Sequence, residues 1–525
     1  MKNLFFLIQV CIAAFFISAC SDGGEDTPTK KPDPTPDSEP SQTKTENEIA
    51  NKWIFDEMSE WYYWNDKLPA ESSLDFKLDP GATDGFFDKI LYTESRANGQ
   101  GMYDKFSWIE SYTANTKSSS KQDIGFDFIP VRFVDAKGNT TGIGNIVTYI
   151  KKGTLAEISG LKRGHVIVAV DDVNLDINNW YSALYANKSS YKLKINDYEI
   201  SKVIEITLSV TQEYEDKYVL MDTVYDNISG HKIGYLVLNT YGSEGNADDL
   251  QNNIYLIQRL LALKNKGITD LVLDLRYNGG GLVTTGVHLG SALVPNRAND
   301  IYEIKKYNAV LQKQIEQSSN ATKESWLYDR FREKISWDDI NYNDIPKLGD
   351  QLQTLSIIAT GYTASCSEMT INCLRPYYKK SGKNLYVIGE RTVGKNVGSW
   401  SIEPENKEIK WKLQPITFQS FNVDNESNYF NGFLPDVEAD DFYDLVVLGE
   451  NLKELGDTKE TLLAQAIAKI TGIPVVKSAK AKSASQFKPF SFDQLEKVGK
   501  RASMIINANE VKGLKTKAAA LRANN

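Results

Sequence analysis

The chain has 525 residues, of which 41% are hydrophobic and 25% are charged, so it can bury a sizeable core and is long enough for two to four domains. Its 69 acidic residues exceed its 60 basic residues, which argues against nucleic acid as a main partner because no basic excess neutralises phosphates. The three histidines and four cysteines show no zinc-ligand spacing, and Cys366 and Cys373 lie about two helical turns apart on an expected helix, too far for a disulfide. We therefore expect no metal, no cofactor and no structural disulfide.

The first 46 residues have the pattern of an export signal and a tether. Residues 1–19 combine a short basic start, an apolar run and small residues before Cys20, which is typical of a signal peptide and too short for a confident membrane span. The ending Ile-Ser-Ala-Cys resembles a bacterial lipoprotein box, which implies lipidation of Cys20; a plain signal peptide cut nearby is the alternative. Residues 20–46 are rich in proline, threonine and charge and predict a disordered tether. The acidic stretch after Cys20 resembles export signals of Bacteroidetes surface lipoproteins, which implies an outer-membrane lipoprotein in the envelope of a Gram-negative bacterium.

Residues 47–116 predict a small helical domain. Apolar residues recur at steps of three and four, at Ile49, Trp53, Ile54, Met58 and Trp61, which indicates an amphipathic helix. The aromatic cluster could stack against a ligand, but a packed core is the simpler interpretation.

Residues 122–212 change to short strands and turns and predict a β-rich domain. A short helix at Leu155–Ser159 is expected to lead through a two-glycine turn into the strand His165–Val170. This stretch resembles a PDZ domain of the bacterial protease type, although His165 stands where that pattern usually has aspartate. The resemblance implies strand addition of an extended C-terminal peptide, with Gly125 and Phe126 in the loop that holds its carboxylate.

Residues 213–472 alternate strands with helices, which predicts an α/β layer with a largely parallel sheet. Strands are expected at Lys232–Leu238, Leu271–Leu275, Leu355–Ala359 and Leu385–Ile388, and helices at Ala247–Lys266, Leu282–Leu293 and Ser365–Tyr378. A polar and aromatic insert, Asn320–Asn343, is expected to be a surface excursion. Residues 473–525, with an amphipathic stretch at Phe492–Asn507, are expected to form a loosely attached C-terminal extension with no assignable role.

Two motifs follow strands of this region, where α/β folds place their sites. Thr363–Glu368 (TASCSE) puts Ser365 between an apolar strand and a helix, where helix amides can face a developing oxyanion. The alternative for Ser365 is a helix N-cap. The segment Gly389–Ser399 carries Lys395, which can serve as a base only if burial lowers its pKa well below about 10.4. A phosphate loop is excluded because Asn396 stands where the serine or threonine that meets magnesium would be.

A third motif, Leu273–Gly281 (LDLRYNGGG), has three glycines that let backbone amides approach a ligand. Taken in chain order, the three motifs resemble those of the C-terminal processing peptidases, also called tail-specific proteases. The resemblance covers the chain from about Asp123 to Gly472. The resemblance implies Ser365 as nucleophile, Lys395 as general base, and the amides of Cys366 and Gly280 as the oxyanion hole. Many relatives have a glutamine four residues after the lysine that orients this base; here Ser399 takes that position.

The implied fold class is a multidomain α+β chain: an N-terminal helical domain, a PDZ-like β-rich domain, and an α/β catalytic domain of the ClpP/crotonase-like type. The implied function is an extracytoplasmic serine endopeptidase that forms an acyl-enzyme on polypeptides with exposed C-termini. Other catalytic centres stay open, with His288 or His231 in a triad or the Cys366 thiol as nucleophile. A catalytically silent peptide- or ligand-binding lipoprotein and an anchored scaffold are the alternatives from other classes.

Overall fold

The computed structural model describes residues 45–96, 102–111, 122–186, 188–243, 248–337, 340–475, 487–496 and 503–506. The predicted signal peptide, the tether up to residue 44 and the lipidation site Cys20 lie outside these residues. Within the described ranges, no helix combines the length and the apolar character that a membrane crossing needs.

The N-terminal segment begins with the predicted amphipathic helix. Thr45 caps α1 through a capping box with Glu48, and the apolar face of α1 is buried. Trp61 packs edge-on against Trp400 at 5.5 Å between ring centres, so the aromatic cluster forms core. The elements here are α1 (Glu46–Trp61), η1 (Asn65–Lys67), η2 (Glu71–Ser73), α2 (Phe86–Ile90) and β1 (Trp108–Ser111), which pairs with β19 (Trp411–Gln414).

A β-rich region follows, with sheet order β22-β2-β3-β4-β6-β7 and β5 attached to β4. Its neighbours are antiparallel. The expected helix at Leu155–Ser159 is wrong: the backbone forms successive turns there, closed by Gly160 at a φ of 86°. The strands are β2 (Phe126–Val134), β3 (Thr140–Ile150), β4 (Val166–Val170), β5 (Val173–Asn174), β6 (Ser190–Asp197), β7 (Lys202–Ser209) and β22 (Phe487–Pro489).

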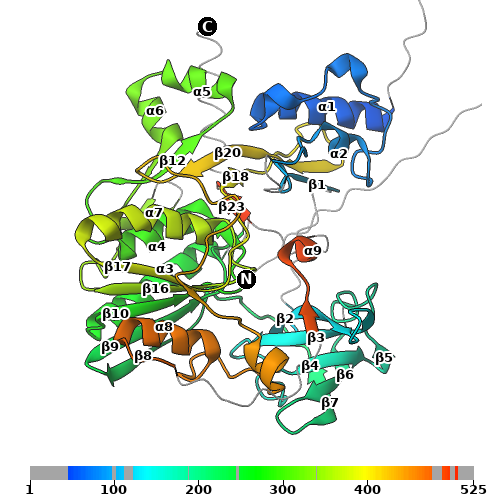
Figure 1. Ribbon diagram of the computed structural model, residues 1–525. Coiled ribbons are helices and arrows are strands. Elements are labelled where there is room, and N and C mark those ends of the chain that lie inside the picture. The colour runs from blue at the N-terminus through cyan, green and yellow to red at the C-terminus, as the bar shows by residue number, and fades with distance from the viewer. Residues whose placement is uncertain are drawn as a thin grey trace, which may run out of the picture. The chain divides into compact units, whose positions relative to one another are not determined.

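The α/β layer is a six-stranded sheet in the order β21-β17-β16-β10-β9-β8 (Figure 1). All its neighbours are parallel except β8, which pairs antiparallel with β9. Alternate side chains enter two cores: Leu236 packs with α3, α4 and α7, whereas Tyr235 and Val237 pack under α8. The elements are β8 (Val219–Ile228), β9 (His231–Leu238), α3 (Asp249–Asn265), β10 (Asp270–Asp274), α4 (Val283–Leu293), β16 (Thr354–Ala359), α7 (Cys366–Ser381), β17 (Asn384–Gly389), β21 (Val437–Glu438) and α8 (Thr461–Thr471). The predicted strands and helices of this layer are confirmed within two or three residues.

A second sheet has the order β11-β23-β18-β20-β12-β13, and α7 contacts both this sheet and β17. Its strands are β11 (Gly280–Leu282), β12 (Ile301–Lys306), β13 (Tyr328–Arg330), β18 (Val397–Ser399), β20 (Ile416–Phe421) and β23 (Ser503–Ile505). α6 (Asn320–Leu327) contacts β12 and β13, and α5 (Ala309–Glu316) contacts α6. The remaining elements are the hairpin of β14 (Lys334–Trp337) and β15 (Ile340–Asp344), the π-helical turn Asp444–Leu448 and α9 (Phe492–Glu496).

Two expectations fail in this second sheet. The insert Asn320–Asn343 is more than a surface excursion, because β13 extends the sheet and Trp326 is fully buried. The described parts of the C-terminal extension, residues 487–496 and 503–506, are not loosely attached, because β22 joins the β-rich sheet and β23 joins the second sheet. Of the described residues in its expected amphipathic stretch, Phe492–Glu496 form a helix and Ser503–Ile505 form a strand. The fold class itself, a multidomain α+β chain with an N-terminal helix and a β-rich region, is confirmed.

Candidate functional site

Ser365 lies at the turn between β16 and α7 with φ 61° and ψ −114°. A non-glycine residue in this region costs of order 1–3 kcal/mol of strain. Its side chain is fully buried, and within the described ranges its hydroxyl has no hydrogen-bond partner. A serine N-cap would have an extended backbone and a hydroxyl that accepts from the first helical turn. Ser365 is the N-cap residue of α7, and Glu368 accepts its backbone N–H as in a capping box. Its backbone is not extended, however, and no hydrogen bond of its hydroxyl to the first helical turn meets the distance and angle criteria, so capping alone does not explain this conformation.

Glu368 joins the loop of Ser365 to the loop of Lys395. Its Oε2 accepts the backbone N–H groups of Ser365 at 2.9 Å and Lys395 at 2.8 Å. Its Oε1 accepts the Thr392 hydroxyl at 2.5 Å and the Gly394 N–H at 2.7 Å. Burial raises the pKa of the Glu368 carboxyl, while these four donors favour its ionised form. One carboxylate thus holds the two expected dyad residues side by side, a role that the motif alone did not reveal.

Lys395 is buried, with 2% of its surface exposed, and its Nζ lies 4.9 Å from the centre of the Phe106 ring. Phe106 comes from the N-terminal region, which therefore forms one wall of the site. Gly394 has a φ of 95°, and a Cβ there would lie 2.3 Å from the carbonyl oxygen of Phe430, so only glycine fits before the lysine. The backbone of the loop is thereby fixed by neighbours on two sides.

A buried glutamine lies beside the predicted base-orienting residue. Ser399 Oγ accepts a hydrogen bond from Gln414 Nε2 at 3.0 Å, and Gln414 Oε1 accepts one from Ser401 at 2.7 Å. Gln414 is 2% exposed and lies at the end of β19. Sequence reasoning missed Gln414, because nothing local connects it to β18.

Residues 277–281, here called the glycine turn, lie against residues 360–365, the turn that carries the expected nucleophile. Ala364 N–H and the Ser367 hydroxyl both donate to the Asn278 carbonyl, at 3.1 and 3.0 Å. The Gly280 N–H donates to Asn278 Oδ1 at 2.9 Å, a bond that it would have to leave to reach an oxyanion. The predicted oxyanion residues Gly280 and Cys366 thus come from turns that touch.

The competing catalytic groups have other partners. The Cys366 thiol donates to the Gly281 carbonyl at 3.1 Å, and burial raises its pKa well above the usual range, which disfavours a thiolate. His288 lies buried between Asn253 and the Ser336 N–H, and burial lowers its pKa to about 3. His231 pairs with Asp270 at 2.8 Å at the start of β9. Both histidines have structural partners, and Ser365 is not among them.

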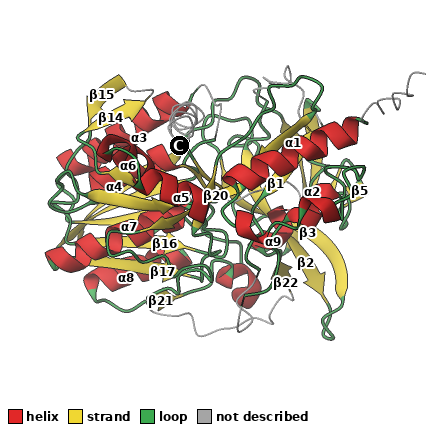
Figure 2. Cartoon of the chain, turned by 90° about the horizontal axis from the view of Figure 1, so that it is seen from above, coloured by secondary structure: helices red, strands yellow, loops and turns green. Residues whose placement is uncertain are grey.

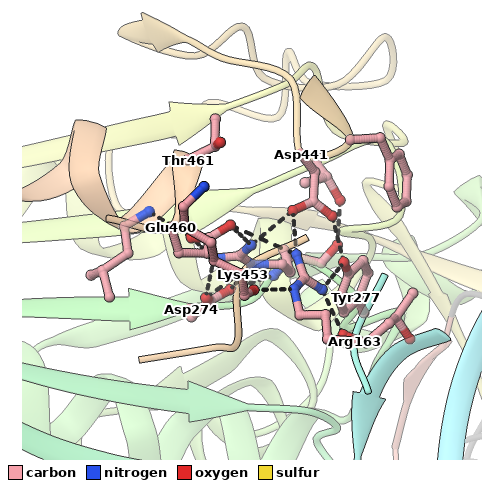
Figure 3. Close-up of polar contacts among 12 residues, drawn as sticks. Arg163, Asp274, Tyr277, Asp441, Lys453, Glu460 and Thr461 are labelled. Carbon is pink, nitrogen blue, oxygen red and sulfur yellow. Dashed lines mark hydrogen bonds and ion pairs between the residues drawn. The ribbon is translucent and has the colours of Figure 1, made fainter. Parts of the chain in front are cut away.

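A buried ion cluster supports the glycine turn (Figure 3). Arg276, just before Tyr277, donates to Asp274, Asp441 and Glu460 at 2.7–3.0 Å. Arg163 of the β-rich region donates to Asp441 at 3.0 Å and to the Tyr277 hydroxyl at 2.7 Å. All five charged side chains are at most 3% exposed. Although burial opposes the ionised form, Arg163 and Arg276 hold the pKa of Asp441 below its usual range.

The predicted carboxylate loop lies beside a pocket of about 660 Å³. Phe126 lines this pocket, together with Lys151, which pairs with Asp123 at 2.6 Å and Asp216 at 2.8 Å. The Gly125 N–H donates to Asp123 at 2.6 Å, and its φ is 84°. The pocket also includes residues of the α/β region such as Tyr218, so it lies between the two regions.

Glu390 is expected to make the free energy of unfolding depend on pH. Its carboxylate accepts the N–H groups of Gly361 at 3.2 Å and Asp441 at 3.1 Å, and burial, with the charge of Asp441 second, raises its pKa to about 7. In the unfolded chain this carboxyl ionises near pH 4.3. Between these values the folded state binds more protons than the unfolded state, so stability falls as the pH rises.

We expect wild type to lose about 2–3 kcal/mol relative to Glu390→Gln between pH 4.5 and pH 7.5. Urea unfolding of both proteins across this range measures the difference. A constant offset would reflect only the hydrogen bonds that the amide changes, and would contradict the raised pKa.

Comparison with known proteins places these features in a family. The family model described as peptidase family S41 matches residues 232–439, and that of the peptidase S41 N-terminal domain matches residues 50–108. A crystal structure of a candidate S41 protease from Bacteroides fragilis NCTC 9343 is 25% identical and aligns with a TM-score of 0.61 over 81% of this chain and 98% of that one.

Curated relatives match over a smaller share of the chain. A carboxyl-terminal-processing protease of Picosynechococcus sp. is 26% identical over 144 residues, and a "Probable CtpA-like serine protease" of Staphylococcus aureus is 23% identical over 347 residues. These alignments cover 26% and 64% of this chain, and 32% and 58% of the relatives. The chain therefore spans less than two thirds of the length of either relative.

Proposed function

Because the chain belongs to peptidase family S41, we propose that it is a serine endopeptidase in which Ser365 and Lys395 form the catalytic dyad. The observation that carries the proposal is the Ser365 hydroxyl, which is buried, lacks a partner within the described ranges and sits on a strained backbone. Strain of this kind is kept at functional sites where the surrounding structure holds it. The four bonds of Glu368 supply that support.

In the proposed reaction, Ser365 Oγ attacks the carbonyl carbon of a peptide bond while its proton passes to Lys395 Nζ. Burial penalises an ammonium ion relative to a neutral amine, which suits a base, whereas the Phe106 ring face 4.9 Å from Nζ attracts a cation. Lys395 then returns the proton to the departing amine, and water hydrolyses the acyl-enzyme by the same route. The N–H of Cys366, with Gly280 after it leaves Asn278, would hold the oxyanion.

We further propose that substrates are polypeptides with free C-termini, bound at the start of β2 near Gly125 and Phe126. Ser399, held by Gln414, would orient the lysine where relatives use glutamine. Cleavage after residue 19 and lipidation of Cys20 would anchor the enzyme in the cell envelope. Metabolic fatty-acid labelling that persists in Cys20→Ala would contradict this anchor.

A covalent probe tests the proposal directly. The purified protein is treated with a fluorophosphonate and digested, and we expect the phosphonyl group on Ser365, with less labelling at low pH, where a lysine base is protonated. In parallel, an unfolded polypeptide with a free C-terminus is expected to be cut faster than its C-terminally amidated form. Labelling on another residue would overturn the dyad, and a protein that binds polypeptides without labelling or cleavage would be the silent binding protein.

A further inference from the structure

The strand between the two catalytic loops comes from the C-terminal extension. β23 pairs in parallel with β11, aligning Ser503 with Gly280 and Ile505 with Leu282. On its other edge, Ile505 aligns with Ser399 of β18, and the Ile506 N–H donates to the Ser399 carbonyl at 3.1 Å. β11 contains Gly280 and Gly281 of the glycine turn, and β18 begins just after Lys395. Figure 1 shows β23 next to β18. Residues 503–506 therefore fill the space between the predicted oxyanion loop and the predicted base loop.

This strand also covers the nucleophile turn. Cys366, next to Ser365, donates its thiol to the carbonyl of Gly281 in β11, the strand that pairs with β23. Ile505 and Ile506 are 9% and 1% exposed, and Ser365 is fully buried. A polypeptide cannot reach a nucleophile in this state, whereas removal of residues 503–506 would free two strand edges beside it.

The described residues 487–490 of the extension contact both the β-rich sheet and the loop before Ser365, and Figure 2 shows β22 beside β2. β22 pairs antiparallel with β2, aligning Phe487 with Phe133. Phe490 then links two regions: its N–H donates to Pro130 of β2 at 2.9 Å, and its carbonyl accepts from Tyr362, three residues before Ser365, at 2.8 Å. Residues 487–490 are thus held against β2 and close to the loop that carries Ser365.

We propose that residues 503–506 are a built-in ligand of the substrate channel, occupying the strand position that a polypeptide must take between β11 and β18. Residues 503–506 pair through their backbone with β11 on one edge and β18 on the other, and this pairing does not depend on side-chain identity. Extended peptides add to exposed sheet edges by the same backbone pairing. The apolar side chains of Ile505 and Ile506 define the kind of segment that this position accepts. Because the segment is tethered, its effective concentration is of the order of millimolar, and it competes strongly with free polypeptides. The inference about competition with substrate rests on the proposed function.

The test uses the full-length chain with the double substitution Ile505→Asp/Ile506→Asp, which places two carboxylates in a buried apolar position and expels the strand. Lys488→Asp is the matched control, since Lys488 is an exposed residue of β22 in the same extension. Binding of a fluorescent peptide with the sequence of residues 500–510 is followed by anisotropy. We expect the double variant to bind it at least tenfold more tightly than wild type or Lys488→Asp, and a scrambled peptide to bind none of them.

Proteolysis of an unfolded polypeptide is measured with the same proteins, after mass spectrometry has shown that the extension is intact. We expect the double variant to cut at least tenfold faster than wild type and the added peptide to inhibit it. Ile506→Pro, which removes the N–H that bonds Ser399 and the buried isoleucine side chain but adds no charge, is expected to give the same changes in smaller measure. It replaces the double variant if that protein loses its cooperative thermal transition.

The outcomes separate the two proposals. A folded variant that fails to bind the peptide overturns the built-in ligand. Equal cleavage by all forms, without inhibition by the peptide, overturns it as well and leaves the peptidase proposal intact. Peptide binding by the variant, with no cleavage by any form, retains the built-in ligand and overturns the peptidase.

Discussion

Replacing Ser365 by alanine or Lys395 by methionine is expected to lower kcat/KM for an unfolded polypeptide at least a thousandfold, about 4 kcal/mol of transition-state stabilisation. The two groups act in one proton transfer, so the double variant should lose little more than either single variant. If wild type is slow because the C-terminal strand fills the channel, the loss is measured in the Ile505→Asp/Ile506→Asp background, where the starting rate is higher.

Stability should move differently from activity in these variants. Ser365→Ala removes a buried hydroxyl that has no partner within the described ranges, so the free energy of unfolding is expected to stay level or rise slightly. Ser356→Ala is the matched control, because Ser356 of β16 is also buried and its hydroxyl likewise lacks a partner there. We expect Ser356→Ala to keep full activity. An active Ser365→Ala protein, or equal losses in both alanine variants, would exclude Ser365 as the nucleophile.

The parts of the site that the sequence predicts well are contiguous. β16 and β17 are short, largely apolar segments, and α7 between them carries small and apolar residues in its first half; all three were expected within a few residues of where they lie. The turns between them carry Ser365 and Lys395, so both candidates could be named from local patterns. Local pattern also misled: the glycine-bounded stretch Leu155–Ser159 forms turns, because short segments rely on neighbours to become helical.

What the sequence could not show are the contacts between distant segments. Glu368 receives donors 24 to 27 residues away, and Gln414 reaches back 15 residues to Ser399. β22 and β23 are three-residue strands, too short for a periodic signal. The strands with which they pair lie far away in the sequence. The extension therefore seemed to be without a role, although its strand pairs with both catalytic loops.

Arg276→Met is expected to destabilise the folded chain by about 3–5 kcal/mol. The cluster holds two arginines against Asp274, Asp441 and Glu460, and the substitution leaves three buried carboxylates with Arg163 alone. Urea unfolding at pH 7.5 measures the loss. Arg259→Met is the matched control: Arg259 pairs with Asp222 at 2.7 Å but is 32% exposed, so its loss should stay near 1 kcal/mol.

The same substitution also tests how the β-rich region reaches the active site. Arg276 immediately precedes the glycine turn, and its partner Asp441 is shared with Arg163 and with the Tyr277 hydroxyl. Arg163→Met is therefore expected to destabilise less than Arg276→Met, because Arg276 still neutralises Asp441. It is also expected to lower kcat, through Tyr277 and the turn that carries Gly280.

Equal stability losses for Arg276→Met and Arg259→Met would show that the buried charges are solvated or neutralised by other means. A normal kcat in Arg163→Met would show that the β-rich region is attached to the turn without influencing it. Since the C-terminal strand pairs with the same glycine turn, the position of that turn would then depend on the strand rather than on the ion cluster.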